Sequence, residues 1–310
     1  MKNKLKFLLK LSISLAFVIW LVVNVDWNQV LFYLRRVSAE QLFLYVAVLL
    51  LGVVISVYKW KFLVDSKGFK NSFGRYFQLY LTGTFINNFL PSFIGGDTYR
   101  AYQIGNKEKR YLPAATSVML DRITGLLGAV ILSSLFAVLN WQTIIAHEAL
   151  LISSVVVFAS AIVLIFISIF ALAGIKFPFV NKISDYLPEK VLKIAKDFGE
   201  YGSDKKILLG SVLLAIAFNL VGVAMANYIL LWCLGINIGM LDYLSIVFLI
   251  SIVSAIPVSI NNIGIKEWAY ITFFGFFGIA SSGALVAALL SRIVQMLISF
   301  AALPYYLKNK

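Results

Sequence analysis

The chain has 310 residues, of which 61% are hydrophobic and only 13% are charged, and its mean hydropathy is +0.91. A soluble domain cannot hide that much apolar surface, because its core grows slowly relative to its area. The net charge of +13 does not indicate nucleic-acid binding, because the basic residues lie in short loops that border apolar runs. We therefore expect one all-α integral membrane domain over residues 1–310.

Eight apolar segments follow one another along the chain, most of them close to the ~20 residues that cross a ~30 Å hydrocarbon core. They cover roughly residues 11–23, 42–58, 76–94, 113–139, 149–173, 207–234, 243–280 and 283–307. Lysines before the first segment place the N-terminus on the cytoplasmic side. No small-residue cleavage site follows that segment, so we expect a retained helix rather than a signal peptide.

The third segment, 76–94, is predicted to be a hairpin rather than a span. Basic loops lie on both sides of it, and the second, around 98–110, contains Arg100. A full crossing would place the second loop outside, against the positive-inside rule. The sequence from Phe89 to Asp97 suits a break, because proline removes a backbone donor and paired glycines permit non-helical backbone.

The segment 243–280 is broken in the same way between Pro257 and Gly264. If it enters from the outside, the last segment runs inward and the C-terminus is also cytoplasmic. The charges therefore predict about six transmembrane helices and two opposed re-entrant hairpins, with Arg35-Arg36 as the basic exception outside. Residues 174–206 are predicted to be a cytoplasmic connector with a short amphipathic surface helix.

The two breaks resemble each other, since each has a proline, a serine, small or amide residues and then an acid, followed by Ala-Tyr. Opposed hairpins predict an inverted repeat with halves at roughly 42–139 and 207–307. Broken helices that meet in such repeats form the substrate site of many transporters. Irregular backbone at membrane depth also requires surrounding protein or water, so we expect a cavity there.

Charged residues inside apolar runs mark the candidate site, because each costs roughly 2.5–3.5 kcal/mol on insertion scales. Asp121 pairs with Arg100 or Lys266, and Arg122 faces a lipid phosphate, unless these residues form a structural ion pair. Asp97 contacts a ligand or caps a helix. The other candidates also have structural alternatives that involve no ligand. Arg292 could extend outward to the membrane surface, and the asparagine amides could satisfy free backbone groups.

The full set of candidate substrate-binding residues lies at the two breaks and on the neighbouring spans. It comprises Asn87, Asn88, Pro91, Ser92, Gly95, Gly96, Asp97, Arg100, Asp121, Arg122, Pro257, Ser259, Asn261, Gly264, Lys266, Glu267 and Arg292. No catalytic triad, HExxH motif, phosphate-binding loop or metal-spaced cluster occurs in the sequence. We therefore expect no enzyme activity, no cofactor and no metal.

The order and spacing of these residues resemble a known family over nearly the whole chain. The residues are Asn87-x-x-Leu90-Pro91-Ser92-x-x-Gly95-Gly96-Asp97-x-x-Arg100, Asp121-Arg122-x-x-Gly125 and Pro257-x-Ser259-x-Asn261-x-x-Gly264-x-x-Glu267. They resemble the membrane domain of lysylphosphatidylglycerol synthases, which also stands alone in proteins described as flippase-like. The resemblance implies lipid translocation, and not lysyl transfer, because we expect no synthase domain here. Asn261 to Gly264 replaces an expected glycine-rich stretch, which leaves the lipid open.

The leading hypothesis is a flippase of the cell membrane for an anionic or aminoacylated phospholipid or a lipid-linked sugar. Arg100, Arg122 and Lys266 would attract phosphate, while the acidic residues would balance them or contact a cationic group. A second hypothesis is a membrane enzyme, or enzyme subunit, for lipid-linked sugars. A third is a scaffold that recruits a cytoplasmic synthase through 174–206. A homo-oligomer is compatible with each of them.

Overall fold

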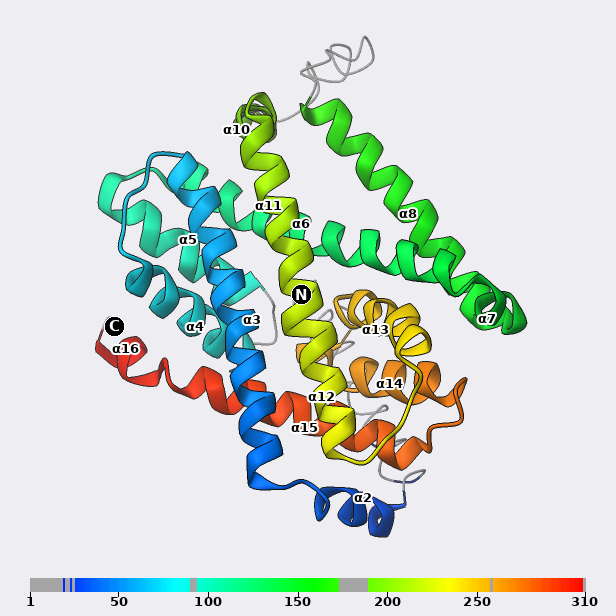
Figure 1. Ribbon diagram of the computed structural model, residues 1–310. Helices are drawn as coiled ribbons and strands as arrows, with labels where there is room; N and C mark the ends of the chain where they lie inside the picture. Colours follow the sequence, from blue (N-terminus) through cyan, green and yellow to red (C-terminus); the bar gives the residue numbers. More distant parts are fainter. Residues whose placement is uncertain are drawn as a thin grey trace.

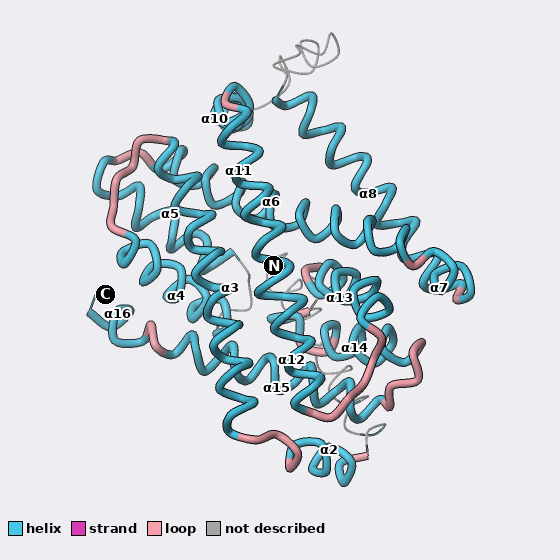
Figure 2. Tube along the Cα trace, viewed as in Figure 1, coloured by secondary structure: helices cyan, strands magenta, loops and turns pink. Residues whose placement is uncertain are grey.

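The computed structural model describes residues 19, 23, 26–89, 94–172, 189–256 and 259–308. This part of the chain is helical, and the described residues form no strand (Figure 2). Four helices are long and apolar enough to cross a membrane: α3 (Ala39–Ser66), α6 (Tyr111–Leu139), the continuous helix Lys205–Cys233 and α15 (Ser281–Phe300). These findings confirm an all-α membrane protein.

A fifth helix, α8 (Glu148–Leu172), has 25 residues, and at ~1.5 Å per residue it is also long enough to span. The first predicted span, 11–23, falls almost entirely outside the described residues. Short helices join or flank the spans: α2 (Trp27–Leu34), α7 (Trp141–Ala146) and α16 (Leu303–Lys308).

Two pairs of shorter helices form the predicted hairpins. α4 (Phe73–Phe89) packs against α5 (Ile94–Glu108), and α13 (Met240–Ser254) packs against α14 (Ile265–Gly275). The four helices have 17, 15, 15 and 11 residues, fewer than the ~20 that a span needs. Residues 90–93 and 257–258 lie outside the described residues, and with them the predicted break residues Pro91, Ser92 and Pro257.

The structure corrects the expectation that residues 98–110 form a loop. They belong mostly to α5, the returning limb of the first hairpin, which ends only at Glu108. Arg100 is 2% exposed. The sequence interpretation failed because it treated Arg100 as a solvated charge, whereas two carboxylates and two aromatic rings surround its guanidinium.

The helices repeat the order span, hairpin, span. The first half is α3, α4–α5 and α6. The second is the helix Lys205–Cys233, α13–α14 and α15, where the long helix comprises α11 (Lys205–Phe218), the π-helical turn η1 (Asn219–Met225) and α12 (Ala226–Cys233). The two opening spans pack side by side, and each closing span packs on the hairpin of the other half, α6 on α13 and α15 on α4 (Figure 1). This is the order that the predicted repeat requires, and the orientation of each hairpin in the bilayer stays a prediction.

The opening spans approach closely where Gly52 of α3 meets Gly222 of η1. A Cβ atom on Gly52 would lie 2.4 Å from the Cα atom of Gly222. Small residues permit such backbone contact between membrane helices. Asn219, in the same π-helical turn, donates its amide to the carbonyl of Gly125 on α6 at 3.1 Å. These contacts join α3, the long helix Lys205–Cys233 and α6.

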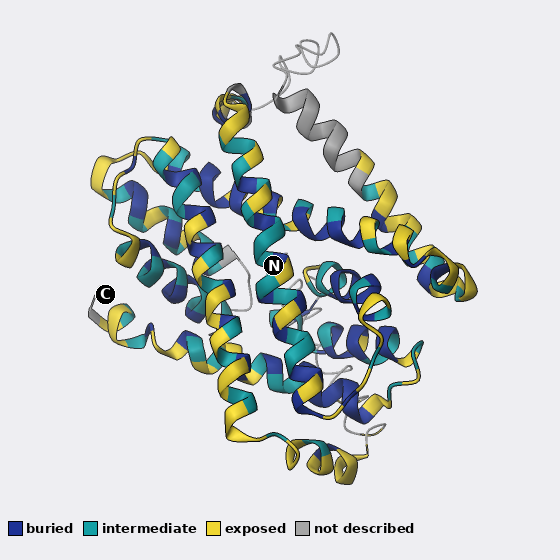
Figure 3. Cartoon of the chain, viewed as in Figure 1, coloured by how far each residue is buried: buried dark blue, intermediate teal, exposed yellow. Residues whose placement is uncertain are grey.

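The apolar core joins the two halves. The largest buried cluster gathers α12, α13, α14 and α15 together with residues of α3, α6 and α8, and a second surrounds Trp60 between α3, α4 and α5. Exposed residues, drawn yellow in Figure 3, gather along α2, α3 and α8. An apolar exposed face on a long helix is what lipid contact requires.

The connector contains a helix, as predicted: α10 (Glu189–Ser203). Residues 173–188 lie outside the described residues. Lys67, at the end of α3, binds α10 through Asp197 at 3.2 Å and Glu200 at 2.8 Å. The hydrogen bond from Lys67 lowers the pKa of the Glu200 carboxyl below its usual range. The connector helix is thus attached to the bundle by two ion pairs that share Lys67.

Candidate functional site

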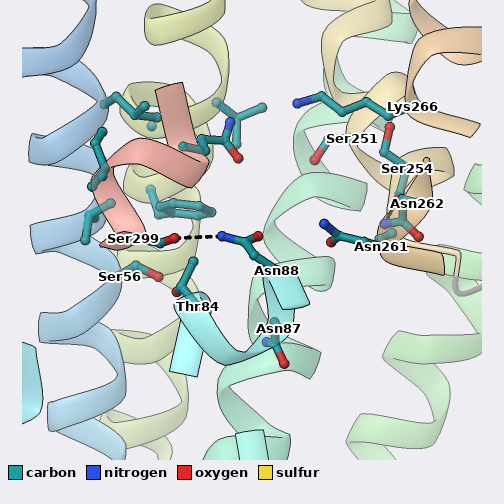
Figure 4. Close-up of a pocket in the computed structure, with 18 of the residues that line it drawn as sticks. Ser56, Thr84, Asn87, Asn88, Ser251, Ser254, Asn261, Asn262, Lys266 and Ser299 are labelled. Carbon is teal, nitrogen blue, oxygen red and sulfur yellow. Dashed lines mark hydrogen bonds between the residues drawn. The ribbon is translucent and has the colours of Figure 1, made fainter. Parts of the chain in front are cut away.

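A cavity of about 440 Å³ lies between the two hairpins. Its walls come from α3, α4, α5 and α6 of the first half and from α11, η1, α12, α13, α14 and α15 of the second, so both halves contribute. Figure 4 shows amide and hydroxyl side chains from both hairpins facing this space. The polar lining residues are Ser56, Thr84, Asn87, Asn88, Asp97, Arg100, Arg122, Asn227, Ser251, Ser254, Asn261, Asn262, Lys266, Gln295 and Ser299.

In the first half, Asp97 of α5 links two arginines. Arg122 of α6 donates to it twice, from Nε at 2.9 Å and from Nη2 at 3.0 Å. Arg100 donates to the same carboxylate at 2.8 Å. Asp97 therefore acts as an ion-pair partner, and not as the helix cap that was one expectation for it. The Arg122 side chain remains 55% exposed and lines the cavity, so it can also contact a ligand.

Asp121 lies behind this pair and is almost fully buried. Its Oδ2 atom is 3.4 Å from Arg100, one of the two partners expected, while Lys266 is not within ion-pair distance. Its other oxygen is 3.0 Å from Nζ of Lys59. The sequence analysis missed Lys59, because it ended the second span at residue 58. The apolar residues that follow, Phe62 to Val64, were the signal that the helix continues.

Aromatic rings complete the environment of Arg100. Its guanidinium lies 4.7 Å from the Trp60 ring centroid and 4.8 Å from that of Tyr80. Such contacts stabilise a desolvated cation without adding negative charge. Together with the two carboxylates, they explain how an arginine can be buried in this span-rich region.

In the second half, Arg292 of α15 holds the break before α14. Its Nε atom is 2.9 Å from Glu267 Oε1. Its two terminal nitrogens donate to the carbonyls of Asn261 at 2.8 Å and Asn262 at 3.1 Å. Arg292 therefore points inward, which contradicts the alternative that it snorkels. Glu267 also accepts from the backbone N–H of Gly264 at 2.7 Å, closing the first turn of α14.

The Asp97–Arg122 and Glu267–Arg292 pairs occupy matching places in the two halves. Each pair joins residues 25 positions apart in the sequence. Each arginine follows the first residue of its closing span by 11 positions, since α6 begins at Tyr111 and α15 at Ser281. Each acid lies in the first turn of the returning helix. This correspondence supports the predicted repeat independently of the similarity between the breaks.

Several predicted residues hold the hairpins together. Asn87 accepts from the backbone N–H of Gly96 at 2.7 Å, which joins α4 to α5. A Cβ on Gly96 would lie 1.9 Å from the Gly83 carbonyl oxygen, so that position requires glycine. Asn88 donates to Ser299 of α15 at 2.7 Å. Gly95 lies on another surface hollow, beside Thr98 and Tyr99.

The second break has an unusual backbone. Asn261 and Asn262 have φ angles of 48° and 54°, and Gly264 has 90°. Left-handed backbone favours asparagine and glycine, which explains these residue types at the tip. Ser259 is 1% exposed, and its hydroxyl has no hydrogen-bond partner among the described residues. It does not line the cavity.

Lys266 is a cavity cation without an acidic partner. Its ammonium donates to Ser291 at 2.7 Å and lies 5.8 Å from the Tyr270 ring. No carboxylate among the described residues lies within 4.0 Å of it, whereas the other basic residues of the site are ion-paired. The described residues also contain no acidic, cysteine or histidine cluster that could hold a metal ion.

Comparison with known proteins agrees with the whole-chain resemblance. Residues 7–302 match the family described as the lysylphosphatidylglycerol synthase TM region. A UPF0104 membrane protein of Methanocaldococcus jannaschii is 26% identical, over 93% of this chain and 90% of its own length. A UPF0104 membrane protein of Methanothermobacter thermautotrophicus is 22% identical over 87% of each chain. The chain belongs to the lysylphosphatidylglycerol synthase transmembrane-region family.

Proposed function

We propose that this protein moves a lipid across the bilayer and that the cavity between the hairpins holds the lipid head group. The observation that carries the proposal is the ammonium of Lys266, which lines this cavity and has no acidic partner among the described residues. An uncompensated cation in a membrane-embedded site is costly, and an anionic ligand relieves that cost. A phosphate group is the natural partner.

The charges around the cavity support an anionic substrate. Five basic side chains meet three acidic ones there: Lys59, Arg100, Arg122, Lys266 and Arg292 against Asp97, Asp121 and Glu267. An excess of positive charge disfavours a cationic head group and favours a phosphate. Hydroxyl and amide groups along the walls can bind further oxygen atoms of the head group.

The size of the cavity supports a head group rather than a whole lipid. A volume of about 440 Å³ lies within the range of small-ligand sites, roughly 300–1,000 Å³. The acyl chains would remain in the bilayer. The sequence contains no nucleotide-binding motif, so we propose movement that is passive or coupled to an ion. We also propose a cell-membrane location with cytoplasmic termini, and no catalysis.

The test is a scrambling assay in liposomes with fluorescent phosphatidylglycerol. A membrane-impermeant reductant bleaches only the outer leaflet, so scrambling appears as additional loss of fluorescence. We expect Lys266→Met to reduce the rate at least tenfold, because the side chain keeps its length and loses its charge. Lys206→Ala is the matched control, since it removes an exposed cation outside the cavity.

Unchanged scrambling in Lys266→Met, with the purified protein folded, would remove this residue from the mechanism. A rival function has a separate readout. If the purified protein alone converts a lipid-linked sugar into a new product, the membrane-enzyme hypothesis replaces the flippase. Mass spectrometry of the lipids that co-purify in mild detergent would identify the substrate class directly.

A further inference from the structure

A second polar cavity lies at the base of the first hairpin, near the C-terminal end of α5, whereas the head-group cavity lies near the N-terminal end of that helix. The second cavity measures about 340 Å³. The side chains that line it come from the loop before α4, the start of α4 and the end of α5. They are Lys70, Asn71, Arg75, Gln103, Ile104, Asn106, Lys107 and Glu108. Ile104 is the only apolar residue in this lining.

The cavity has an excess of positive charge. No carboxylate among the described residues lies within 4.0 Å of Lys70, Arg75 or Lys107. Arg75 instead donates to the neutral Gln103 side chain at 3.2 Å. The single acid of the lining, Glu108, is paired with Arg110 at 3.2 Å, outside the lining. Three basic residues therefore face the cavity without an acidic partner.

Membrane insertion alone does not explain this arrangement. The positive-inside rule accounts for basic residues on one side of the membrane, but it does not require them to line one hollow with three amide side chains. The second hairpin gives a contrast. At its base, Asp242 accepts from Asn140 at 2.9 Å, and none of its loop residues 235–239 is basic. The loop before the second hairpin therefore does not repeat the basic residues that precede α4 in the first.

We propose that this second cavity binds a phosphate-bearing group. The guanidinium of Arg75 can offer two parallel donors to phosphate oxygens, and the two ammonium groups add charge. The amides of Asn71, Gln103 and Asn106 supply further donors. Lys107 follows Asp97 by ten residues on α5, which places the two cavities about 15 Å apart along that helix. An anionic lipid held here would stand next to the translocation site.

Two sources could supply the phosphate, a lipid head group or a soluble phosphate compound. The experiment uses the full chain in a neutral detergent. Phosphatidylglycerol is added in one arm and followed by native mass spectrometry, and inorganic phosphate is added in the other and followed by calorimetry. All measurements are made in the Lys266→Met background, so that binding at the first cavity is suppressed to the same extent in every protein.

The informative variant is Lys70→Ala with Lys107→Ala, since both side chains are exposed and neither forms an ion pair among the described residues. Lys205→Ala with Lys206→Ala removes the same charge from exposed positions at the start of α11. We expect about tenfold weaker phosphatidylglycerol or phosphate binding in the first pair only. Arg75→Lys keeps the charge and removes the planar fork, so an intermediate loss is expected.

Each outcome decides the question. Loss confined to the phosphatidylglycerol arm identifies a lipid site, and loss in the phosphate arm identifies a site for soluble phosphates. Equal binding by both double variants and their parent overturns the proposal. The parent protein already lacks the Lys266 ammonium, so a negative result in these binding measurements does not bear on the proposed translocation function. That function is tested separately by the scrambling assay.

Discussion

Replacing Asp121 by asparagine tests whether the buried charges of the first half hold that half together. The substitution keeps the shape of the side chain and removes its charge. Lys59 and Asp121 have side chains that are 3% and 5% exposed, so water cannot compensate the loss. Removing one partner of a buried ion pair costs about 3–5 kcal/mol.

The geometry favours the lower end of that range. Lys59 also donates to the main-chain carbonyl of residue 121 at 2.6 Å, and that contact survives the substitution. Arg100 keeps Asp97 at 2.8 Å. We therefore expect a loss of about 3 kcal/mol, which shifts the unfolding equilibrium by roughly two powers of ten.

The assay is unfolding of the detergent-solubilised protein by titration with sodium dodecyl sulfate. Glu189→Gln is the control, because it breaks an ion pair with Lys193 in which both side chains are mostly exposed, and such pairs contribute little. The double variant Lys59→Met with Asp121→Asn should be more stable than the sum of its parts. If Asp121→Asn loses no more stability than Glu189→Gln, the buried charges do not hold the helices together.

Three further outcomes follow from the geometry. Arg292→Lys should abolish scrambling, measured in liposomes, because lysine lacks the planar guanidinium whose separate nitrogens reach one carboxylate and two carbonyls. Gly52→Val should lower the unfolding midpoint by forcing two opening spans apart, at a cost of about 1–3 kcal/mol, whereas Gly74→Val, in open space, should not. Lys67→Ala should increase proteolysis of α10, because it removes the contact with Glu200. Acidification should do the same. The pKa of the Glu200 carboxyl is lowered in the folded protein, so the contact is fully formed above the ordinary pKa of a glutamate and is lost as the pH falls through the lowered pKa.

The architecture could be predicted because charge and hydropathy act on whole segments. Runs of apolar residues located the spans, and the stretches that contain proline separate the limbs of each hairpin. The paired glycines Gly95 and Gly96 were expected in non-helical backbone, but they lie in the first turn of α5, where Gly96 permits close contact with α4. The ends of the helices could not be predicted in the same way. α3 extends to Ser66 and α5 to Glu108, through charged residues that appear solvated in the sequence. Tertiary pairing, which a linear sequence does not display, neutralises Lys59 and Arg100.

Some of the candidate residues lie together in the structure, whereas their pairings were only partly anticipated, and their role in binding stays a prediction. Asn87, Asn88 and Asp97, which flank the first break, line one cavity with Asn261 of the second break and with Arg122 and Lys266. Arg122 was expected to face a phosphate, but it binds Asp97, and Arg292 binds the second break instead of pointing outward. Pairing depends on which helices pack together, and composition and spacing do not determine that packing.

The repeat also explains why Lys266 has no acidic partner among the described residues. The matching ion pairs are related by 170 positions, Asp97 to Glu267 and Arg122 to Arg292. The same step relates Asp121, which neutralises the first half, to Ser291. Ser291 accepts a hydrogen bond from Lys266 at 2.7 Å, so a neutral oxygen stands where the first half has a carboxylate.

Restoring that carboxylate is therefore a direct test of the head-group site. Ser291→Asp places an acid beside Lys266, so the lysine gains an internal counter-ion and no longer favours phosphate. We expect scrambling of phosphatidylglycerol to fall at least tenfold while the protein stays folded. Ser291→Asn has nearly the same volume without the charge and should retain more activity. Equal scrambling by the two variants would show that the charge of Lys266 does not select the lipid.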